Sequence, residues 1–338
     1  MKKLIILFNI FISFNSCEKS ENELNTNFNK KILDGYFVTS IAFDSHGTAW
    51  IGTHKQGLIK YSSGNATYYN SSNSTFPDTS VIWDIEVDSK DNVWIGGDAL
   101  TKYDGNSFTS FNSKNSKIPE DWIYCIAVDS KDNIWFTSCR SGKGGIVKYD
   151  GINWTVYTPA NSILPVNYVK SIAIDKNDII WLALQEKVNH AYLVKISNDD
   201  WSIISNKDLG FTPYWFCKIQ CDSKNKLCGA IDYSLYWQSE NPSGPQAFTY
   251  DGVNAIQLQF DTNSDIFTFT IDNNDHYWCT GLFYKSDNQI LQTVIAIYNG
   301  NKWITDYITL KDKSIFCSEE SLDNKIWIGT GDGIYINN

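Results

Sequence analysis

One tryptophan-centred segment recurs along almost the whole chain. Its clearest copy, SIAFDSHGTAWIGTHKQGLIKYSSG, begins at Ser40, and related copies follow at spacings of roughly 41–50 residues. The aligned position is occupied by Trp50, Trp94, Trp135, Trp181, Cys228, Trp278 and Trp327. The position six residues earlier is occupied by Asp44, Asp88, Asp129, Asp175, Asp222, Asp272 and Ser321. Repeats of this length bury their apolar faces only against their neighbours, so the chain must fold as a series of similar units.

Each copy can be divided into four short strands joined by polar turns. An apolar strand such as 169–174 precedes the aspartate, and the tryptophan strand follows it. Later in the copy an Asp-Gly or Asn-Gly pair marks a hairpin. These pairs are Asp104-Gly105, Asp150-Gly151, Asp251-Gly252 and Asn299-Gly300. Aromatic residues make up 15% of the chain and there is one Met, which favours strands over helices.

Four-stranded units of this length are typical of a β-propeller. We therefore predict an all-β, seven-bladed β-propeller over residues 31–338. The seventh copy supplies only three strands, and residues 28–33 are free to provide the fourth. Such an N-terminal strand closes the ring and leaves no long open edge. The alternative is a six-bladed ring from which the weak fifth copy is expelled as an insertion.

The repeated aspartate stands at the entrance to a turn in each blade. Because the copies lie one blade apart, we interpret this residue as a turn cap, not as a metal ligand or an acid–base group. The first copy has a glycine in this turn, Gly47. We expect Asn92 and Asn133 to replace the turn glycine in later copies, since Asn tolerates a positive φ.

The first 16 residues have the features of a signal peptide. Lys2 and Lys3 precede an apolar stretch, residues 4–14, that is too short to span a bilayer as a helix. The stretch resembles a bacterial lipoprotein signal, which implies lipidation of Cys17, although Phe14 stands where Leu is usual. Residues 17–30 are expected to form a flexible tether. An ordinary cleaved signal is the alternative.

These features predict a protein outside the cytoplasm that meets a membrane only through its lipid. We expect the outer membrane, at either its periplasmic or its surface face. The net charge of −10, with Arg140 the only arginine, argues against nucleic acid as a partner. Of the eight cysteines, Cys221 and Cys228 flank one hairpin and could form a disulfide. No CxxC pair is present, so no metal site or cofactor is expected.

The copies resemble the two-component regulator propeller repeat over about residues 36–338. The matching residues are Leu164-Pro165, Val169, Ile172, Asp175 and Trp181, then Trp50-Ile51-Gly52-Thr53 with Gly57-Leu58, and Trp327-Ile328-Gly329-Thr330 with Gly333-Ile334. The resemblance implies a seven-bladed fold. Long members of that family carry a histidine kinase and sense polysaccharide breakdown products. Here we expect a stand-alone lipoprotein without a kinase domain.

A looser resemblance is to streptogramin-type lyases, through Trp135-Phe136-Thr137. Their chemistry uses a histidine-centred site and a magnesium ion. The four histidines here argue against that chemistry, because His46 and His276 fall in turns on the face opposite His54 and His190.

Propellers bind ligands where the loops between strands two and three, and those between blades, converge at the channel mouth. Aromatic rings on these loops offer flat apolar faces to a sugar or peptide at small entropic cost. The candidate rim residues are Trp83, Trp122, Tyr124, Tyr168, Trp215, Tyr233, Trp237, Arg140, Lys143, His54 and His190. The alternative is that these rings pack between blades.

We therefore predict a non-catalytic binding or scaffold protein that recognises a glycan or a protein partner at the channel mouth. One alternative is a lyase or hydrolase acting on a polysaccharide or cyclic peptide, which requires a polar cluster with shifted pKa values inside the channel. The other is a sensory input module that acts with a separate two-component signalling protein.

Overall fold

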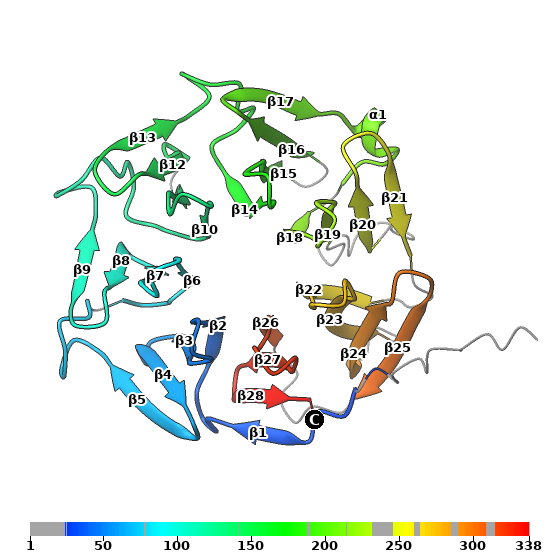
Figure 1. The fold of residues 1–338 in the computed structure, drawn as a ribbon. Helices are drawn as coiled ribbons and strands as arrows, with labels where there is room; N and C mark the ends of the chain where they lie inside the picture. Colours follow the sequence, from blue (N-terminus) through cyan, green and yellow to red (C-terminus); the bar gives the residue numbers. More distant parts are fainter. Residues whose placement is uncertain are drawn as a thin grey trace, which may run out of the picture.

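The computed structural model describes Leu24 and residues 26–77, 79–140, 142–187, 190–213, 215–231, 246–259, 264–284, 290–308 and 315–337. These residues form seven antiparallel sheets of four strands each, arranged as a ring. Figure 1 shows one strand of each sheet at the centre and one at the outer wall. The chain is an all-β, seven-bladed propeller, as predicted.

The strands fall into four concentric sets. The innermost set is β2 (Val38–Phe43), β6 (Asp84–Val87), β10 (Ile126–Val128), β14 (Val169–Ile174), β18 (Phe216–Cys221), β22 (Ser264–Ile271) and β26 (Ile315–Glu320). The second set, which carries the repeated tryptophans, is β3 (Ala49–Thr53), β7 (Val93–Gly96), β11 (Ile134–Ser138), β15 (Ile180–Lys187), β19 (Leu227–Ile231), β23 (Tyr277–Tyr284) and β27 (Ile326–Thr330).

The third set is β4 (Leu58–Ser62), β8 (Leu100–Tyr103), β12 (Gly145–Tyr149), β16 (His190–Ser197), β20 (Ala247–Tyr250), β24 (Ile290–Tyr298) and β28 (Gly333–Ile336). The outer set is β5 (Asn65–Tyr69), β9 (Phe108–Phe111), β13 (Trp154–Tyr157), β17 (Asp200–Ile204), β21 (Ala255–Leu258), β25 (Trp303–Ile308) and β1 (Lys30–Ile32). A short helix, α1 (Asn206–Leu209), connects β17 to the next blade.

The last blade is closed by the N-terminal strand. β1 pairs antiparallel with β28, and Ile32 lies opposite Ile334. An ion pair of 2.7 Å between Lys31 Nζ and Asp332 Oδ2 adds to this closure. The fifth copy forms a complete blade, β18 to β21, so the six-bladed alternative is wrong.

In four of the seven blades the repeated aspartate ties its turn to the tryptophan six residues later. In the third blade, Asp129 Oδ1 accepts the backbone N–H groups of Lys131 and Asn133 at 3.0 and 2.9 Å, and Asp129 Oδ2 accepts Trp135 Nε1–H at 3.1 Å. The same tryptophan bond is present in the blades of Asp44, Asp88 and Asp272. In the fifth blade, where Cys228 replaces the tryptophan, Asp222 accepts the hydroxyl of Tyr277 from the next blade. These bonds confirm the structural role predicted for the aspartate.

The residue with positive φ in this turn differs from the one predicted. It is Gly47 in the first blade and Asp91 and Asp132 in the next two, so it lies one position before Asn92 and Asn133. The Asn92 side chain instead donates to Asp88. Asp91 also joins two blades, because its carboxylate accepts the backbone N–H and the hydroxyl of Ser45 at 2.9 and 2.7 Å.

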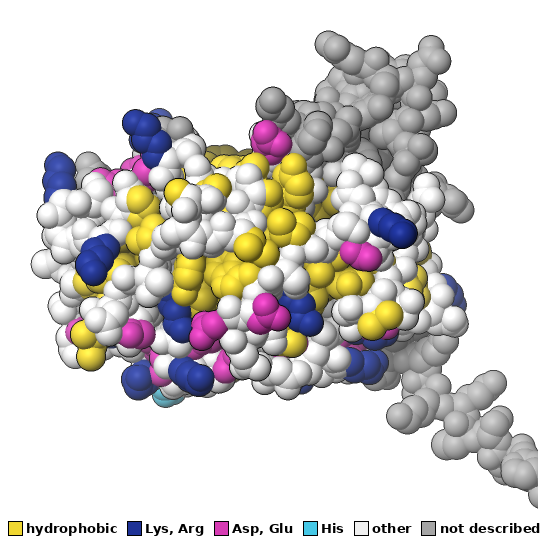
Figure 2. Space-filling view, turned by 90° about the horizontal axis from the view of Figure 1, so that it is seen from above, with side chains coloured by type: hydrophobic (Ala, Val, Ile, Leu, Met, Phe, Trp, Pro, Cys, Tyr) yellow, Lys and Arg dark blue, Asp and Glu magenta, His cyan; other side chains and the backbone are white. Residues whose placement is uncertain are grey.

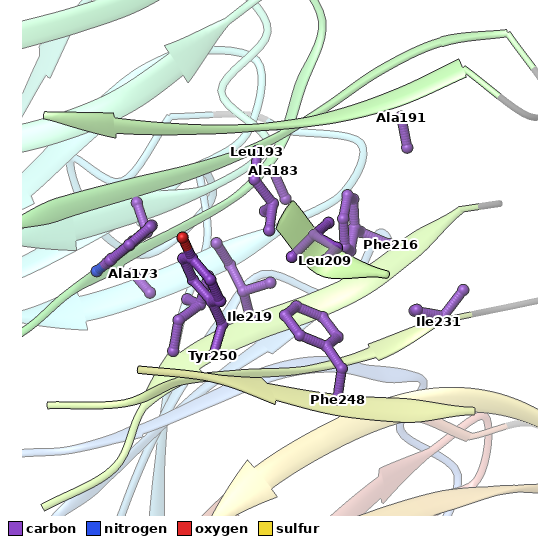
Figure 3. Packing of buried hydrophobic residues seen from close by; sticks show 12 residues of the cluster. Ala173, Ala183, Ala191, Leu193, Leu209, Phe216, Ile219, Ile231, Phe248 and Tyr250 are labelled. Carbon is purple, nitrogen blue, oxygen red and sulfur yellow. The ribbon is translucent and has the colours of Figure 1, made fainter. Parts of the chain in front are cut away.

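The apolar core lies between blades. One cluster joins β14–β17 to β18–β21 through α1 (Figure 3), and its labelled members include Ala183, Leu193, Leu209, Phe216 and Phe248. On the outer wall seen in Figure 2, cationic and anionic side chains are interspersed with apolar ones. The blades therefore bury their sheet faces against each other, while outer strands such as β5 and β17 carry exposed side chains.

Candidate functional site

The seven innermost strands enclose a central channel with a volume of about 960 Å³. Every blade contributes to its wall, because the lining includes residues of β2, β6, β10, β14, β18, β22 and β26. At one end the loops between second and third strands contact the loops between blades. Backbone bonds from His54 to Phe37 and from Cys139 to Trp122 are examples. The loops between blades also supply residues to the channel wall at this end, among them Trp83, Tyr124 and Trp215.

Aromatic rings from consecutive blades gather at this mouth. The Trp83 ring lies 5.3 Å from that of Trp122 and 5.5 Å from that of Tyr124, centroid to centroid. The Arg140 guanidinium lies 4.7 Å from the Trp122 ring centre. Trp83 and Tyr124 line the channel directly. These four predicted rim residues thus form one surface.

Lys170, on β14, belongs to the same surface although the sequence analysis did not select it. Its ammonium lies 4.4 Å from the ring centre of Tyr124 and 5.9 Å from that of Trp215, and it donates a hydrogen bond to the Tyr124 hydroxyl. Burial lowers the pKa of Lys170, but Tyr124 and Tyr168 more than offset this, so the pKa is raised overall. We call Trp83, Trp122, Tyr124, Lys170 and Trp215 the mouth cluster.

The other predicted rim residues are more scattered. His54 packs edge-on against Phe37 at 5.1 Å and is not part of the channel wall. Tyr168, two residues before Lys170, is half-buried, and Lys143 is exposed on its loop. Tyr233, Trp237 and the side chain of His190 lie outside the described residues, as does Cys17.

Charged side chains line the channel below the mouth cluster. They include Asp84 and Glu86 on β6, Lys218 on β18 and Glu319 on β26. Lys218 Nζ lies 3.7 Å from Glu319 Oε2, with 40% and 30% of the two side chains accessible from within the channel. Asp84 has a structural role as well, since its Oδ2 accepts the backbone N–H of Ile126 in the next blade at 2.8 Å. We call these four residues the inner charged cluster.

Burial shifts the pKa values of this cluster. It raises the pKa of Asp84 to about 6, although the Ile126 N–H and Lys218 act against the shift. Burial, with the charges of Asp84 and Glu319, holds the pKa of Glu86 well above its usual range. The pKa of Glu319 is also raised by burial. Burial lowers the pKa of Lys218, but the three carboxylates more than offset this and raise it overall, so the cluster holds one ammonium.

The repeat register contains a signal for this cluster. Asp84 and Lys218 stand four residues before the repeated aspartate, where other blades have Ser40, Ser171 and Thr268. Glu86 stands two residues before Asp88. Glu319 stands two residues before Ser321, which replaces the aspartate in the last blade. Ala42, Ala127 and Ala173 occupy that position in other blades. Both positions lie on the innermost strand and hold a small residue in most other blades. A charged residue there therefore marks the channel wall.

The disulfide considered for Cys221 and Cys228 is not present, and both thiols are free. The pairing of β18 with β19 explains this, because Cys228 lies opposite Gln220, whereas Cys221 lies opposite Leu227. Successive side chains on a strand point to opposite faces. The two sulfurs therefore do not face each other across the hairpin.

Within the described part of the chain, no three His, Cys, Asp or Glu side chains come together as a metal site. No helix in the same residues has the length and apolar character needed to cross a bilayer.

Residues 32–55 match the sequence model of the two component regulator propeller family. No curated protein sequence matches the chain. Among solved structures, one similar chain is the extracellular domain of a protein described as a hybrid two component system, BT4673 from B. thetaiotaomicron. It shares 18% identity and a TM-score of 0.68 over 90% of this chain. This chain covers only 41% of that domain, less than half its length.

Two further structures match nearly end to end. Streptogramin B lyase shares 16% identity with a TM-score of 0.69, covering 92% of this chain and 96% of the lyase. YCF48 bound to D1 peptide shares 10% identity with a TM-score of 0.63, covering 91% and 93%. At these identities the likeness concerns the fold. The chain is a seven-bladed β-propeller that carries the two component regulator propeller repeat at residues 32–55.

Proposed function

We propose that this chain is an extracytoplasmic binding propeller that recognises a glycan or a protein partner at the channel mouth. The observation that carries the proposal is the mouth cluster. Trp83 packs there against Trp122 and Tyr124, and Lys170 links Tyr124 to Trp215. Aromatic faces at the opening of a concave site favour sugar rings and extended peptides.

The proposed location rests on the chain start and on the comparisons. Residues 1–17 have the pattern of a lipoprotein signal, and the hybrid-system structure is an extracellular domain. We propose that Cys17 is lipidated and anchors the propeller to the outer membrane. Intact-mass measurement of the mature protein would show a diacyl or triacyl addition at Cys17. A mature chain with an unmodified cysteine would contradict the anchor.

The binding proposal is tested by removing the aromatic surface. The variant carries Trp83→Ala, Trp122→Ala and Trp215→Ala together, and it is compared with wild type on a glycan array and in pull-downs from envelope extracts. Tyr68→Ala is the matched control, because Tyr68 is an exposed aromatic on the outer strand β5. We expect the triple variant to lose the wild-type ligand and the control to keep it. Unchanged binding by a correctly folded triple variant would refute the mouth as the site.

A second candidate function is catalysis, and the inner charged cluster favours it. Carboxyl groups with raised pKa values beside a lysine are what general acid–base chemistry on a polysaccharide or cyclic peptide requires. If the protein is a lyase or hydrolase, product release from the bound ligand would stop in Glu86→Gln and Glu319→Gln. Binding without any product in wild type would remove this candidate.

A third candidate is a sensory module, which the similarity to extracellular domains of two component systems supports. It predicts that a strain lacking the protein fails to induce genes in response to the ligand. A strain that loses only ligand capture, with normal induction, would favour a binding role alone.

A further inference from the structure

The two lysines that the inner strands β14 and β18 place in the channel differ in their electrostatic surroundings. Lys218 faces three carboxylates, Asp84, Glu86 and Glu319. Lys170 has no carboxylate within ion-pair distance in the described residues, and its interactions are with the tyrosine hydroxyl and the two ring faces described above. The Lys218 ammonium is thus paired with nearby carboxyl groups, whereas the Lys170 ammonium is not.

Lys170 is half-buried and keeps its proton at neutral pH, because its pKa is raised. A partly desolvated ammonium loses hydration, and aromatic faces return only part of that loss. An anion that entered the mouth would accept a charge-assisted hydrogen bond from Lys170 and so replace the rest of the lost hydration. The Trp83 ring, which lines the channel beside Tyr124 and does not carry the ammonium, would at the same time offer its face to a flat or ring-shaped body.

The inner charged cluster offers less to such an anion. Its one ammonium, on Lys218, already lies 3.7 Å from Glu319 and faces the carboxyl groups of Asp84 and Glu86 as well. An incoming anion would have to compete with these groups for the same charge. An anionic group is therefore favoured at the level of Lys170 over the level of the inner charged cluster.

We propose that the mouth cluster binds an acidic carbohydrate, with the carboxylate or sulfate of a sugar on Lys170 Nζ and the sugar face against the neighbouring rings. This inference rests on the proposed function and specifies its ligand class. The sugar is preferred to an acidic peptide because Tyr124 and Trp215 hold the ammonium, with the Trp83 ring beside Tyr124 on the channel wall. Among the described residues the cations placed on the rings of the mouth cluster are Lys170 and Arg140, so aromatic surface exceeds positive charge.

The test measures binding of oligogalacturonate and of its methyl ester, which has the same length without the charge, by calorimetry. Hexaglutamate supplies the same carboxylate from a peptide. The proteins are wild type, Lys170→Met, Lys170→Arg and the control Lys60→Met. Lys60 also lies over a tryptophan, at 5.2 Å from the Trp50 ring centre, but it belongs to the third strand of its blade and not to the channel wall. Thermal unfolding of each variant reports whether it is folded.

We expect oligogalacturonate to bind wild type at least about tenfold more tightly than its ester, and Lys170→Met to remove that difference. Lys170→Arg should retain it, and Lys60→Met should be unaffected. Tighter binding of hexaglutamate than of oligogalacturonate would overturn the carbohydrate assignment. Equal affinity for acid and ester, or an unchanged Lys170→Met, would overturn the role of the lysine.

The outcomes separate this inference from the proposed function. One outcome is that neutral glycans or a protein bind wild type and Lys170→Met but not the triple tryptophan variant. Binding at the mouth then stands as the function, and the acidic group on Lys170 is refuted. If neither the array nor the pull-down yields a ligand, both fail.

Discussion

The bond between the repeated aspartate and the repeated tryptophan should have a measurable free energy, and two blades provide a matched pair to measure it. Trp135 and Trp181 are 4% and 3% exposed, and each lies under a lysine from the third strand, at 5.1 and 5.4 Å. Each also contacts one tyrosine ring, stacked for Trp135 and edge-on for Trp181, at 6.0 and 5.9 Å between centroids. The main difference is in the bonding of the indole nitrogen. Trp135 Nε1 donates to Asp129 at 3.1 Å, whereas Trp181 Nε1 is buried without a hydrogen-bond partner.

Replacing either tryptophan by phenylalanine removes similar packing but a different polar contribution. Trp135→Phe loses a hydrogen bond to a carboxylate, which contributes about 1.5–3 kcal/mol. The carboxylate of Asp129 stays paired, because the Asn133 side chain also donates to Oδ2 at 2.7 Å. Trp181→Phe loses no bond and removes a buried donor whose desolvation costs about 1–3 kcal/mol. Trp135→Phe should therefore destabilise the protein by at least about 2 kcal/mol more than Trp181→Phe.

Urea unfolding followed by circular dichroism gives both free energies on one scale. The control is the slope of the transition, which must match between the variants so that the midpoints can be compared. Equal losses in the two variants would refute the reasoning, since they would mean that the aspartate bond adds nothing to the packing of the tryptophan.

Three further predictions concern the channel, the ring closure and the thiols. Asp84 has a folded-state pKa of about 6 against an ordinary value of 3.8, so the folded protein holds the proton more tightly and loses stability as the pH rises through this interval. In wild type this proton accounts for a fall of at most about 3 kcal/mol in the unfolding free energy as the pH rises, and Asp84→Asn should abolish that fall. A pH profile parallel to that of wild type would contradict this. Deleting residues 1–33, which removes β1 and the buried Phe28, should lower stability by about 3 kcal/mol or more and expose the edge of β28. Deleting residues 1–23, which keeps β1, Phe28 and the packed Leu24, should not, and equal unfolding midpoints for the two deletions would argue against the closure. A reductant should leave the thermal midpoint unchanged because Cys221 and Cys228 are free, and a lower midpoint would reveal a disulfide.

The fold could be predicted from the sequence because its register depends on local chemistry. An aspartate that caps a turn and bonds to a tryptophan requires the same pair of residues, six positions apart, in most blades. The blades could therefore be counted even where Cys228 replaces the tryptophan. The closing strand followed from the missing fourth strand of the last copy. The turn conformation was misassigned by one residue, although counting from the aspartate would have aligned Gly47 with Asp91.

The site was predictable only in part. Trp83, Trp122, Tyr124 and Arg140 could be assigned to one surface because loop order determines which loops share a face. Lys170 and the inner charged cluster were missed because the search covered loops, whereas the innermost strands also line the channel. Which ring stacks on which cation depends on side-chain directions across blades, and the repeat pattern of one chain does not contain this information.

The most direct test of the binding account is a crystal structure of the protein with the oligosaccharide that binds best on the array. The account predicts ligand density at the channel mouth, against the rings of Trp83, Tyr124 and Trp215, with an acidic group near Lys170 Nζ. Density on the opposite face of the ring, or on the outer wall with an empty mouth, would contradict it.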